Sequence, residues 1–213
     1  MKITLHRVMP FPLSSMQHGE QSIWGKHIAL TPGSKVLLNA SSGKGKSTFI
    51  NTVLGIRKDF TGEIDFDGKK ITELDTTEWT NIRQTKISAI FQDLQLFPSL
   101  TVKENLLLKN ELTKTYNEEQ IRSFLEYIGI ADKWDQQCGL LSMGQQQRVA
   151  IVRALCQPYE WLLMDEPFSH LDEENAQRCM KLIIDRTDEL NSGFVLTTLG
   201  DDHGVQYDQT LML

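Results

Sequence analysis

The stretch VLLNASSGKGKSTF, residues 36–49, runs from an apolar strand-like segment through small residues to Lys46, Ser47 and Thr48. It nearly matches the phosphate-binding pattern G-x-x-x-x-G-K-[ST], in which backbone N–H groups and a helix N-terminus bind an anion. The first glycine of the pattern is replaced by Ala40, which costs little where φ is negative. A Gly/Ser-rich turn with a solvated lysine is the alternative, but the strand before it and the helix former after it favour a nucleotide site.

In this interpretation Lys46 reaches the β- and γ-phosphates of a nucleotide, and the Ser47 hydroxyl binds Mg²⁺. The loop alone does not define which reaction follows. The residues expected to surround the phosphates are Ala40, Ser41, Ser42, Gly43, Lys44, Gly45, Lys46, Ser47 and Thr48.

The composition is that of a globular protein, with 213 residues, 40% of them hydrophobic and 23% charged. A net charge of −6 argues against nucleic acid as a partner. The three cysteines have no ligand-like spacing, so buried free thiols in a reducing compartment are expected. The N-terminus MKITLHRVMPF lacks the apolar core of a signal peptide, and no apolar run approaches the ~18 residues that span a bilayer. We therefore expect a soluble, cytoplasmic protein.

Strand and helix patterns alternate along the chain. Ile64 and Phe66 alternate with polar residues before the hairpin signal Asp67-Gly68. Residues 87–91 predict a strand, and residues 117–128 predict a helix that Asn117 caps and Gly129 ends. The final third predicts a helix near 143–155, a strand at 161–165, a helix near 172–190 and a strand at 194–198.

This order predicts an α/β fold with a mainly parallel sheet, an antiparallel β region near the N-terminus and an inserted α-helical subdomain. We expect one domain over residues 1–213. Its core is formed by 1–92 and 141–213, and its helical subdomain by about 93–140.

Three further segments carry a family resemblance. They are AIFQDLQLFPSLTVKEN around Gln92, LSMGQQQRVAIVRAL from Leu141 and WLLMDEPFSHLD from Trp161. Together with the loop at 40–48, they resemble the ATP-binding-cassette (ABC) ATPases, which have a P-loop NTPase core. The motifs follow the family's order and cover essentially the whole chain.

Ser142, followed by Gln145 three residues later, forms a capping-box pattern at a helix start, and such a terminus binds anions. An ordinary capped surface helix is the alternative. The resemblance implies that Ser142, Met143, Gly144 and Gln145 contact the γ-phosphate of ATP held by a second subunit. It therefore implies a head-to-tail dimer around two ATP molecules, with Asp172 of the SHLD segment near the partner's site.

The segment LLMD places Asp165 at the carboxyl end of a buried strand, where ligands of open α/β sheets bind. The resemblance implies that Asp165 contacts Mg²⁺, that Glu166 is the general base for the attacking water, and that Gln92 senses Mg²⁺ and this water. A solvated turn, or a cap formed by Glu166, is the alternative for the two carboxylates.

The chain departs from the family pattern in two further places. Met143 stands where the signature has glycine, so its side chain must point away from the nucleotide. In the family, a histidine after the last core strand contacts the γ-phosphate. The matching position in this chain is Thr198 or Leu199, and His203 lies four or five residues later. We expect this histidine contact to be absent unless a rearranged loop returns His203. Phe11 is the candidate for stacking on adenine, with a core phenylalanine as the alternative.

The resemblance implies an ATP-hydrolysing subunit of an ABC transport complex. The expected partners are ATP, a second copy of the chain and a separate integral membrane permease, at the cytoplasmic face of the membrane. The lipoprotein-release, macrolide-exporter and cell-division ATPases are most similar. The alternative is a nucleotide-gated dimerising clamp with little hydrolysis, which the missing histidine suggests. A protein acting on ribosomes or DNA is disfavoured by the acidic charge and the single cassette.

Overall fold

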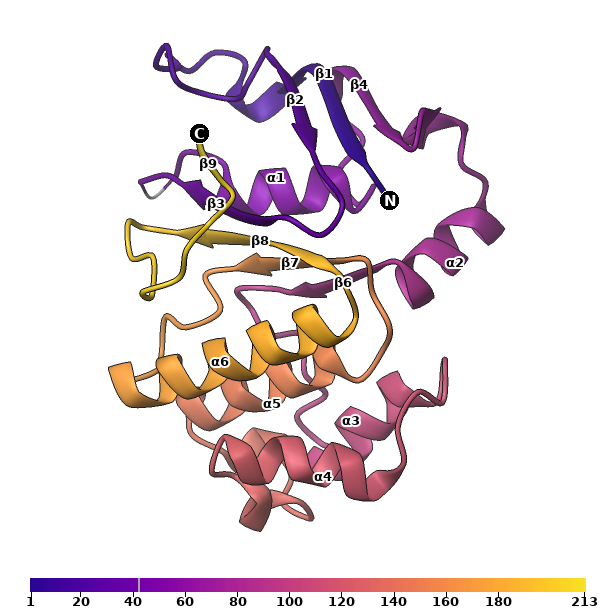
Figure 1. Cartoon of the computed structure of the whole chain (residues 1–213), viewed down its shortest axis with the longest axis vertical. Helices are drawn as coiled ribbons and strands as arrows, with labels where there is room; N and C mark the ends of the chain where they lie inside the picture. Colours follow the sequence, from indigo (N-terminus) through magenta and orange to yellow (C-terminus); the bar gives the residue numbers. More distant parts are fainter. Residues whose placement is uncertain (42) are drawn as a thin grey trace.

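A computed structural model of the chain describes residues 1–41 and 43–213, and its elements stack in layers along the long axis (Figure 1). An antiparallel sheet lies at one end and a parallel sheet in the middle, with α1 (Lys46–Val53) between them. Helices α5 (Met143–Leu155) and α6 (Glu173–Glu189) cover the other face of the parallel sheet. Helices α3 (Val102–Asn110) and α4 (Glu118–Tyr127) form a lobe at the far end.

The antiparallel sheet has the order β2-β1-β4-β5. Its strands are β1 (Ile3–Pro10), β2 (His27–Leu30), β4 (Phe60–Phe66) and β5 (Lys69–Lys70). The predicted hairpin after Phe66 is confirmed, because β4 and β5 pair antiparallel on either side of Asp67 and Gly68, both at positive φ.

The second sheet is parallel throughout and has the order β6-β7-β8-β3-β9. Its strands are β6 (Ile87–Ile90), β7 (Trp161–Asp165), β8 (Gly193–Thr198), β3 (Lys35–Asn39) and β9 (Gln209–Met212). The mainly parallel α/β class is therefore confirmed. The predicted strands 161–165 and 194–198 and helix 143–155 agree with β7, β8 and α5 to within one residue, whereas β6 ends one residue before the predicted Phe91.

Alternate strand residues face opposite layers, as the pleat requires. Val36 and Leu38 pack with Phe49 and Ile50 of α1, whereas Leu37 belongs to the cluster formed with α5 and α6. The cysteines Cys138, Cys156 and Cys179 are buried and unpaired among the described residues, as predicted. Burial raises the pKa of the Cys138 thiol to about 11.

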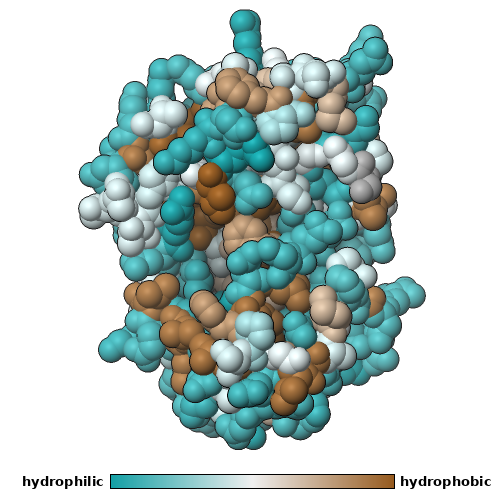
Figure 2. Space-filling model, turned by 180° about the vertical axis from the view of Figure 1, so that it is seen from behind, coloured by the Kyte–Doolittle hydropathy of each residue, from teal (hydrophilic) through white to brown (hydrophobic). Residues whose placement is uncertain are grey.

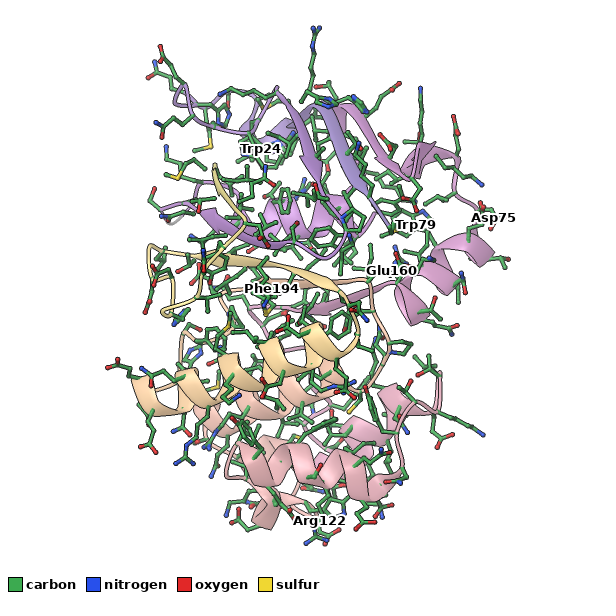
Figure 3. The ribbon with its side chains drawn as sticks, viewed as in Figure 1. Trp24, Asp75, Trp79, Arg122, Glu160 and Phe194 are labelled. Atoms are coloured by element: carbon green, nitrogen blue, oxygen red, sulfur yellow. The ribbon has the colours of Figure 1, made fainter. Side chains whose placement is uncertain are left out.

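Helix α2 (Thr76–Thr85) was not predicted. Its Trp79 lies between the helix and the antiparallel sheet (Figure 3), with its ring edge-on to Phe66 at 5.9 Å between centroids. The lobe helices agree better with the sequence, since Asn117 caps α4 and Gly129 follows it at positive φ. The exact limits of the helical subdomain stay a prediction. Over residues 1–41 and 43–213, no helix is both long and apolar enough to cross a bilayer.

Candidate functional site

The topology brings two of the predicted motifs to one edge of the parallel sheet. Strand β8 lies between β3 and β7, so the loop after β3 and the carboxylates after β7 emerge side by side. In the register, Asn39 pairs with Thr198 and Asp165 with Thr197. This is the carboxyl edge, where open α/β sheets bind their ligands.

The described part of the loop between β3 and α1 has two glycines at positive φ, Gly43 and Gly45. Gly45 lies at φ 103°, a conformation that strains any other residue, and a Cβ atom there would also require Leu13 Cδ1, 2.6 Å away, to move. Ala40 is buried and lies outside the positive-φ region, which explains why alanine is tolerated in place of glycine. Ser41, Gly43 and Lys44 are exposed, and the predicted contact of Ser42 lies outside the described residues.

Lys46, the first residue of α1, is 5% exposed and points into this edge of the sheet. Its ammonium donates to Ala40 O at 2.9 Å and to Ser41 O at 3.2 Å, and it lies 3.2 Å from Glu166 Oε1. Two of the residues predicted for one site, Lys46 and Glu166, are therefore in direct contact although 120 positions separate them in the chain. Two backbone carbonyls and the Glu166 carboxylate hold the Lys46 ammonium beside the loop, where a phosphate would approach.

Asp165 is 3% exposed, and burial raises the pKa of its carboxyl group. Hydrogen bonds from Ser47 and Thr197 act in the opposite direction, and Thr197 Oγ1 donates to Asp165 Oδ1 at 3.0 Å. Ser47 and Asp165 are two of the three residues that the sequence assigns to a metal, the third being Gln92, and they lie in contact. Both offer oxygen donors, which Mg²⁺ prefers.

Glu166 lies at φ 48°, a region that residues other than glycine rarely adopt. A buried side chain from α5 supports this conformation: Gln147 Nε2 donates to Glu166 O at 3.3 Å and to Ser169 Oγ at 3.3 Å. Gln147 Oε1 also accepts from His170 N at 2.8 Å. Helix α5, which begins with the predicted signature residues, is therefore bonded directly to the loop that carries Glu166.

The signature residues form the start of α5. Ser142 Oγ accepts from Gln145 N at 3.3 Å, and Gln145 Oε1 accepts from Ser142 N at 2.9 Å, so the predicted capping box is present. Ser142 and Met143 are exposed. A Cβ atom at Gly144 would lie 2.8 Å from His170 O, so glycine permits the close approach of α5 to the loop after β7. None of the hydrogen bonds within the described chain joins Ser142 to Lys46, Asp165 or Glu166.

Within the described chain, the remaining predicted residues form no hydrogen bond or ion pair with Lys46 or Glu166. Gln92 is exposed in the turn after β6, and its side chain has no hydrogen-bond partner among the described residues. Asp172 caps α6 by accepting from Asn175 N at 2.8 Å, which gives it a structural role within the chain. Phe11 is 56% exposed, so the alternative of a core phenylalanine is wrong, and stacking on adenine stays a prediction.

His203 lines a cavity of about 270 Å³ together with Glu166 and Thr198. Its ring packs edge-on against Phe168 at 4.7 Å, and its Nδ1 lies 3.5 Å from Asp201 Oδ2. The loop after β8 therefore places His203 in the lining of the same cavity as Glu166, the candidate general base.

Sequence reasoning missed two residues that shape the site, Gln147 and Thr197. Gln147 stands in a run of three glutamines, and only its helical phase distinguishes the buried one from Gln145 and Gln146. Thr197 could have been suspected because it and Thr198 are the two hydroxyl residues at the end of an otherwise apolar strand. Such a residue needs a polar partner when it is buried.

The comparisons with known proteins agree with this geometry. The profile of the ABC transporter family matches residues 25–169. An uncharacterized ABC transporter ATP-binding protein of Mycobacterium tuberculosis is 36% identical over 170 residues, covering 78% of this chain and 68% of the relative. The lipoprotein-releasing system ATP-binding protein LolD of Coxiella burnetii is 29% identical over 189 residues, covering 87% of this chain and 81% of LolD.

Among solved structures, the dimeric bacterial ABC transporter cassette MJ0796 superposes with a TM-score of 0.82 at 28% identity, covering 99% of this chain and 94% of the other. A post-hydrolysis dimer of MJ0796 bound to ADP and Pi has a TM-score of 0.76 at 31% identity, covering 93% and 88%. A P-loop ATPase fold of the cassette type is therefore established. The chain belongs to the ABC transporter family, and it is an ATP-binding cassette ATPase.

Proposed function

We propose that the chain binds ATP at the loop 40–48 and hydrolyses it there to drive a separate membrane permease. The observation that carries this proposal is the contact of Lys46 Nζ with Glu166 Oε1 at 3.2 Å, beside the buried Asp165. This contact supports the proposal, because Lys46 would be the phosphate-binding cation, Asp165 the metal-binding carboxylate and Glu166 the base of one site. Such a set suits phosphoryl transfer to water, in which the enzyme positions groups and stabilises charge.

Mg²⁺ is the metal that fits the residues present. Over residues 1–41 and 43–213 there is no group of three or more His, Cys, Asp or Glu residues that could hold a metal by themselves. Magnesium is usually held by one or two protein oxygens together with substrate phosphates. Asp165 and Ser47 would supply these oxygens. The bound ion would neutralise charge on the phosphates.

Each residue has a distinct part in the proposed reaction. Lys46 would leave the carbonyls of Ala40 and Ser41 to bind the β- and γ-phosphates, because charged phosphate oxygens are stronger acceptors than carbonyls. Glu166 would accept a proton from water as the water oxygen bonds to the γ-phosphorus. The bond from that phosphorus to the bridging oxygen breaks, and ADP and phosphate leave. Gln92 would orient the same water after the lobe moves towards the core.

We propose a head-to-tail homodimer, in which Ser142 and its neighbours complete the site of the partner chain. Within one chain, Ser142 bonds only to its own helix cap among the described residues, although the exposed start of α5 can bind an anion. The two MJ0796 structures are dimers, one of them with ADP and Pi. The exposed Met143 side chain can turn towards solvent, which would leave the backbone N–H groups of α5 for the partner's γ-phosphate.

The permease would dock in a groove between the core and the helical lobe. This lobe groove is a cavity of about 410 Å³ lined by β6, the end of α1, α3 and the final turn of α5. Hydrophobic residues gather on the back face, where the lobe meets the core (Figure 2). Four apolar side chains of the groove are at least half exposed: Ile56, Phe97, Leu108 and Leu112. An apolar groove of this kind fits the apolar face of a helix from a partner at the cytoplasmic face of the membrane.

Two measurements test this function together. Phosphate release by the purified chain is expected to need Mg²⁺ and to stop when the metal is chelated. In analytical ultracentrifugation, a Glu166→Gln variant saturated with ATP and Mg²⁺ should sediment as a particle of doubled mass, and adding Ser142→Arg should return it to a single chain. A single particle under saturating nucleotide would contradict the shared site.

The alternative is a clamp that binds ATP and dimerises but hydrolyses little. It predicts the same doubled particle, so sedimentation does not separate it from the motor. Turnover does: a clamp would hydrolyse ATP no faster than its Glu166→Gln variant. The cavity shared by His203 and Glu166 favours the motor, because it offers an imidazole near the proposed γ-phosphate position.

Replacing His203 by alanine is expected to lower ATP turnover about tenfold or more, since one electrostatic donor near the reacting phosphate commonly contributes this much or more. The exposed His27 provides the matched control, and His27→Ala should keep the wild-type rate. Phosphate release under saturating ATP measures both. An unchanged rate for His203→Ala would mean that the family's histidine contact is missing in this chain.

A further inference from the structure

Two histidines lie side by side on the antiparallel sheet, which forms the end of the molecule opposite the helical lobe (Figure 1). His6 of β1 is the register partner of His27 of the edge strand β2. Their Nδ1 atoms are 3.1 Å apart, and both residues are exposed. Cross-strand partners project from the same face of a sheet, so the two imidazoles meet at the surface. This histidine pair lies on a different sheet from the one whose edge carries Lys46 and Glu166.

A buried carboxylate orients one ring of the histidine pair. His6 Nε2 donates to Asp65 Oδ2 at 2.8 Å, and Asp65 Oδ1 accepts from Gly68 N at 2.9 Å. The hairpin turn therefore holds the carboxylate, and the carboxylate holds the ring. A neutral imidazole with its proton on Nε2 has an unprotonated Nδ1. The His6 nitrogen that faces His27 thus carries a lone pair that can bind a proton donor or a metal ion.

The spacing of the two Nδ1 atoms fits a single bound ion. Nitrogens at about 2.0–2.1 Å from one ion are about 2.9 Å apart for a right angle at the ion and about 3.4 Å apart for a tetrahedral angle. The observed 3.1 Å lies between these values. The rings are tilted by 49° rather than stacked. His27 has no other hydrogen-bond partner among the described residues, so its exposed ring can turn until both lone pairs point at one ion.

We propose that His6 and His27 bind a divalent transition-metal ion that prefers imidazole, such as Zn²⁺ or Cu²⁺, through their Nδ1 atoms. Asp65 is the positioning residue, and water fills the remaining coordination positions. A plain hydrogen bond between the rings is the alternative, but metal-binding histidines characteristically donate their other N–H to a carboxylate, as His6 does. Mg²⁺ does not suit this pair, because it prefers oxygen ligands. The site is therefore distinct from the proposed magnesium site beside the loop 40–48.

An ion at the histidine pair would join β1 to β2. The two histidines are 21 positions apart in the chain, and only the folded sheet brings their rings together, so the ion stabilises the folded state. The cysteines do not compete for the ion, since Cys138, Cys156 and Cys179 are buried. Glu63, the neighbour of His6 on β4, is already paired with Lys70. We therefore expect one ion per chain and a higher melting temperature.

Isothermal titration calorimetry with Zn²⁺ alone tests the site, using untagged chain that has been treated with a chelator and dialysed. Wild type is expected to bind one ion per chain. Asp65→Asn should weaken Zn²⁺ binding about 10- to 100-fold, the usual cost of losing the carboxylate behind a metal-binding histidine. His27→Gln should weaken it more, because a ligand itself is lost. His18→Gln is the matched control and should bind Zn²⁺ like wild type, since His18 Nε2 contacts only the Leu13 carbonyl.

Two further readouts separate metal binding from a merely structural role. The electron paramagnetic resonance spectrum of Cu²⁺ should show coupling to two imidazole nitrogens in wild type and to at most one in His27→Gln. Zn²⁺ at about 100 times its Kd should raise the Tm of wild type by about 5–10 °C and leave that of His27→Gln unchanged. Without metal the two proteins should melt alike, because His27 is exposed.

Three results would overturn the metal site. Wild type without saturable Zn²⁺ binding would leave only a hydrogen bond between the rings. Unchanged Zn²⁺ affinity in both His6→Gln and His27→Gln would place the ion elsewhere, as would Cu²⁺ coupled to a single imidazole nitrogen in wild type. ATP turnover of His27→Gln with Mg²⁺ should equal that of wild type in every case, so the failure of this site would not bear on the proposed ATPase.

Discussion

Glu166→Gln is expected to lower ATP turnover about 100- to 1000-fold, because general-base catalysis contributes on the order of 10²–10⁴ in rate. The amide keeps the size of the carboxylate and can still hydrogen-bond to the attacking water, but it does not accept its proton. The position is also mechanically constrained, since Glu166 lies at φ 48° and its carbonyl accepts from the buried Gln147. Phosphate release at saturating ATP and Mg²⁺ measures the change.

The matched control is Glu119→Gln on the exposed side of α4, which removes the same charge far from the sheet edge and should keep the wild-type rate. If ATP remains bound between the two subunits of the proposed homodimer until it is hydrolysed, the Glu166→Gln variant should also accumulate as a nucleotide-bound dimer. Equal turnover for wild type and Glu166→Gln would refute the motor and leave the nucleotide-gated clamp.

Strong local signals made the central fold predictable from the sequence. The apolar strand, glycine loop and helix former at 36–49 are local features. The first four residues of β7, WLLM, are an apolar run that can only be a buried strand or helix segment. Capping residues also predicted where helices begin, because Asn117 and Ser142 are the N-caps of α4 and α5. These predictions succeeded because propensity, periodicity and capping agreed with one another.

Helix α2 shows why a local signal was missed. Asp75 and Glu78 form a capping box, but the ten residues that follow carry only one buried side chain, Ile82, so hydrophobic periodicity is weak. The helix depends instead on tertiary contacts: the ring of Trp79 lies against Phe66, and Arg83 packs over the same ring at 4.8 Å. Such contacts cannot be read from spacing along the chain.

The site was predictable in its residues but less so in its connections. Lys46 and Glu166 were assigned to one nucleotide site, and the strand order brings them into contact. The link from Gln147 to the Glu166 loop, the hydroxyl of Thr197 on Asp165, and the return of His203 all depend on how loops after adjacent strands pack. Loop geometry after a strand is set by these neighbours rather than by the loop's own sequence.

Replacing Lys46 by methionine is expected to weaken ATP binding about 10- to 150-fold, since a hydrogen bond to a charged group contributes about 1.5–3 kcal/mol. Methionine is unbranched and one heavy atom shorter than lysine, so its thioether can remain in the space that the Lys46 stem fills at 5% exposure. The change removes the ammonium from Glu166 Oε1 and from the carbonyls of Ala40 and Ser41. Isothermal titration calorimetry with ATP and Mg²⁺ measures the affinity.

The exposed Lys58 provides the control, because Lys58→Met removes one positive charge close to the end of α1 without touching the loop. If charge alone attracted the nucleotide, both variants would lose affinity by a similar factor, and more so at low ionic strength. If Lys46 contacts the phosphates, only Lys46→Met loses affinity, and the loss persists in high salt because the contact is buried. Unchanged ATP affinity in Lys46→Met would exclude this lysine from the phosphate site and with it the assignment of the loop 40–48.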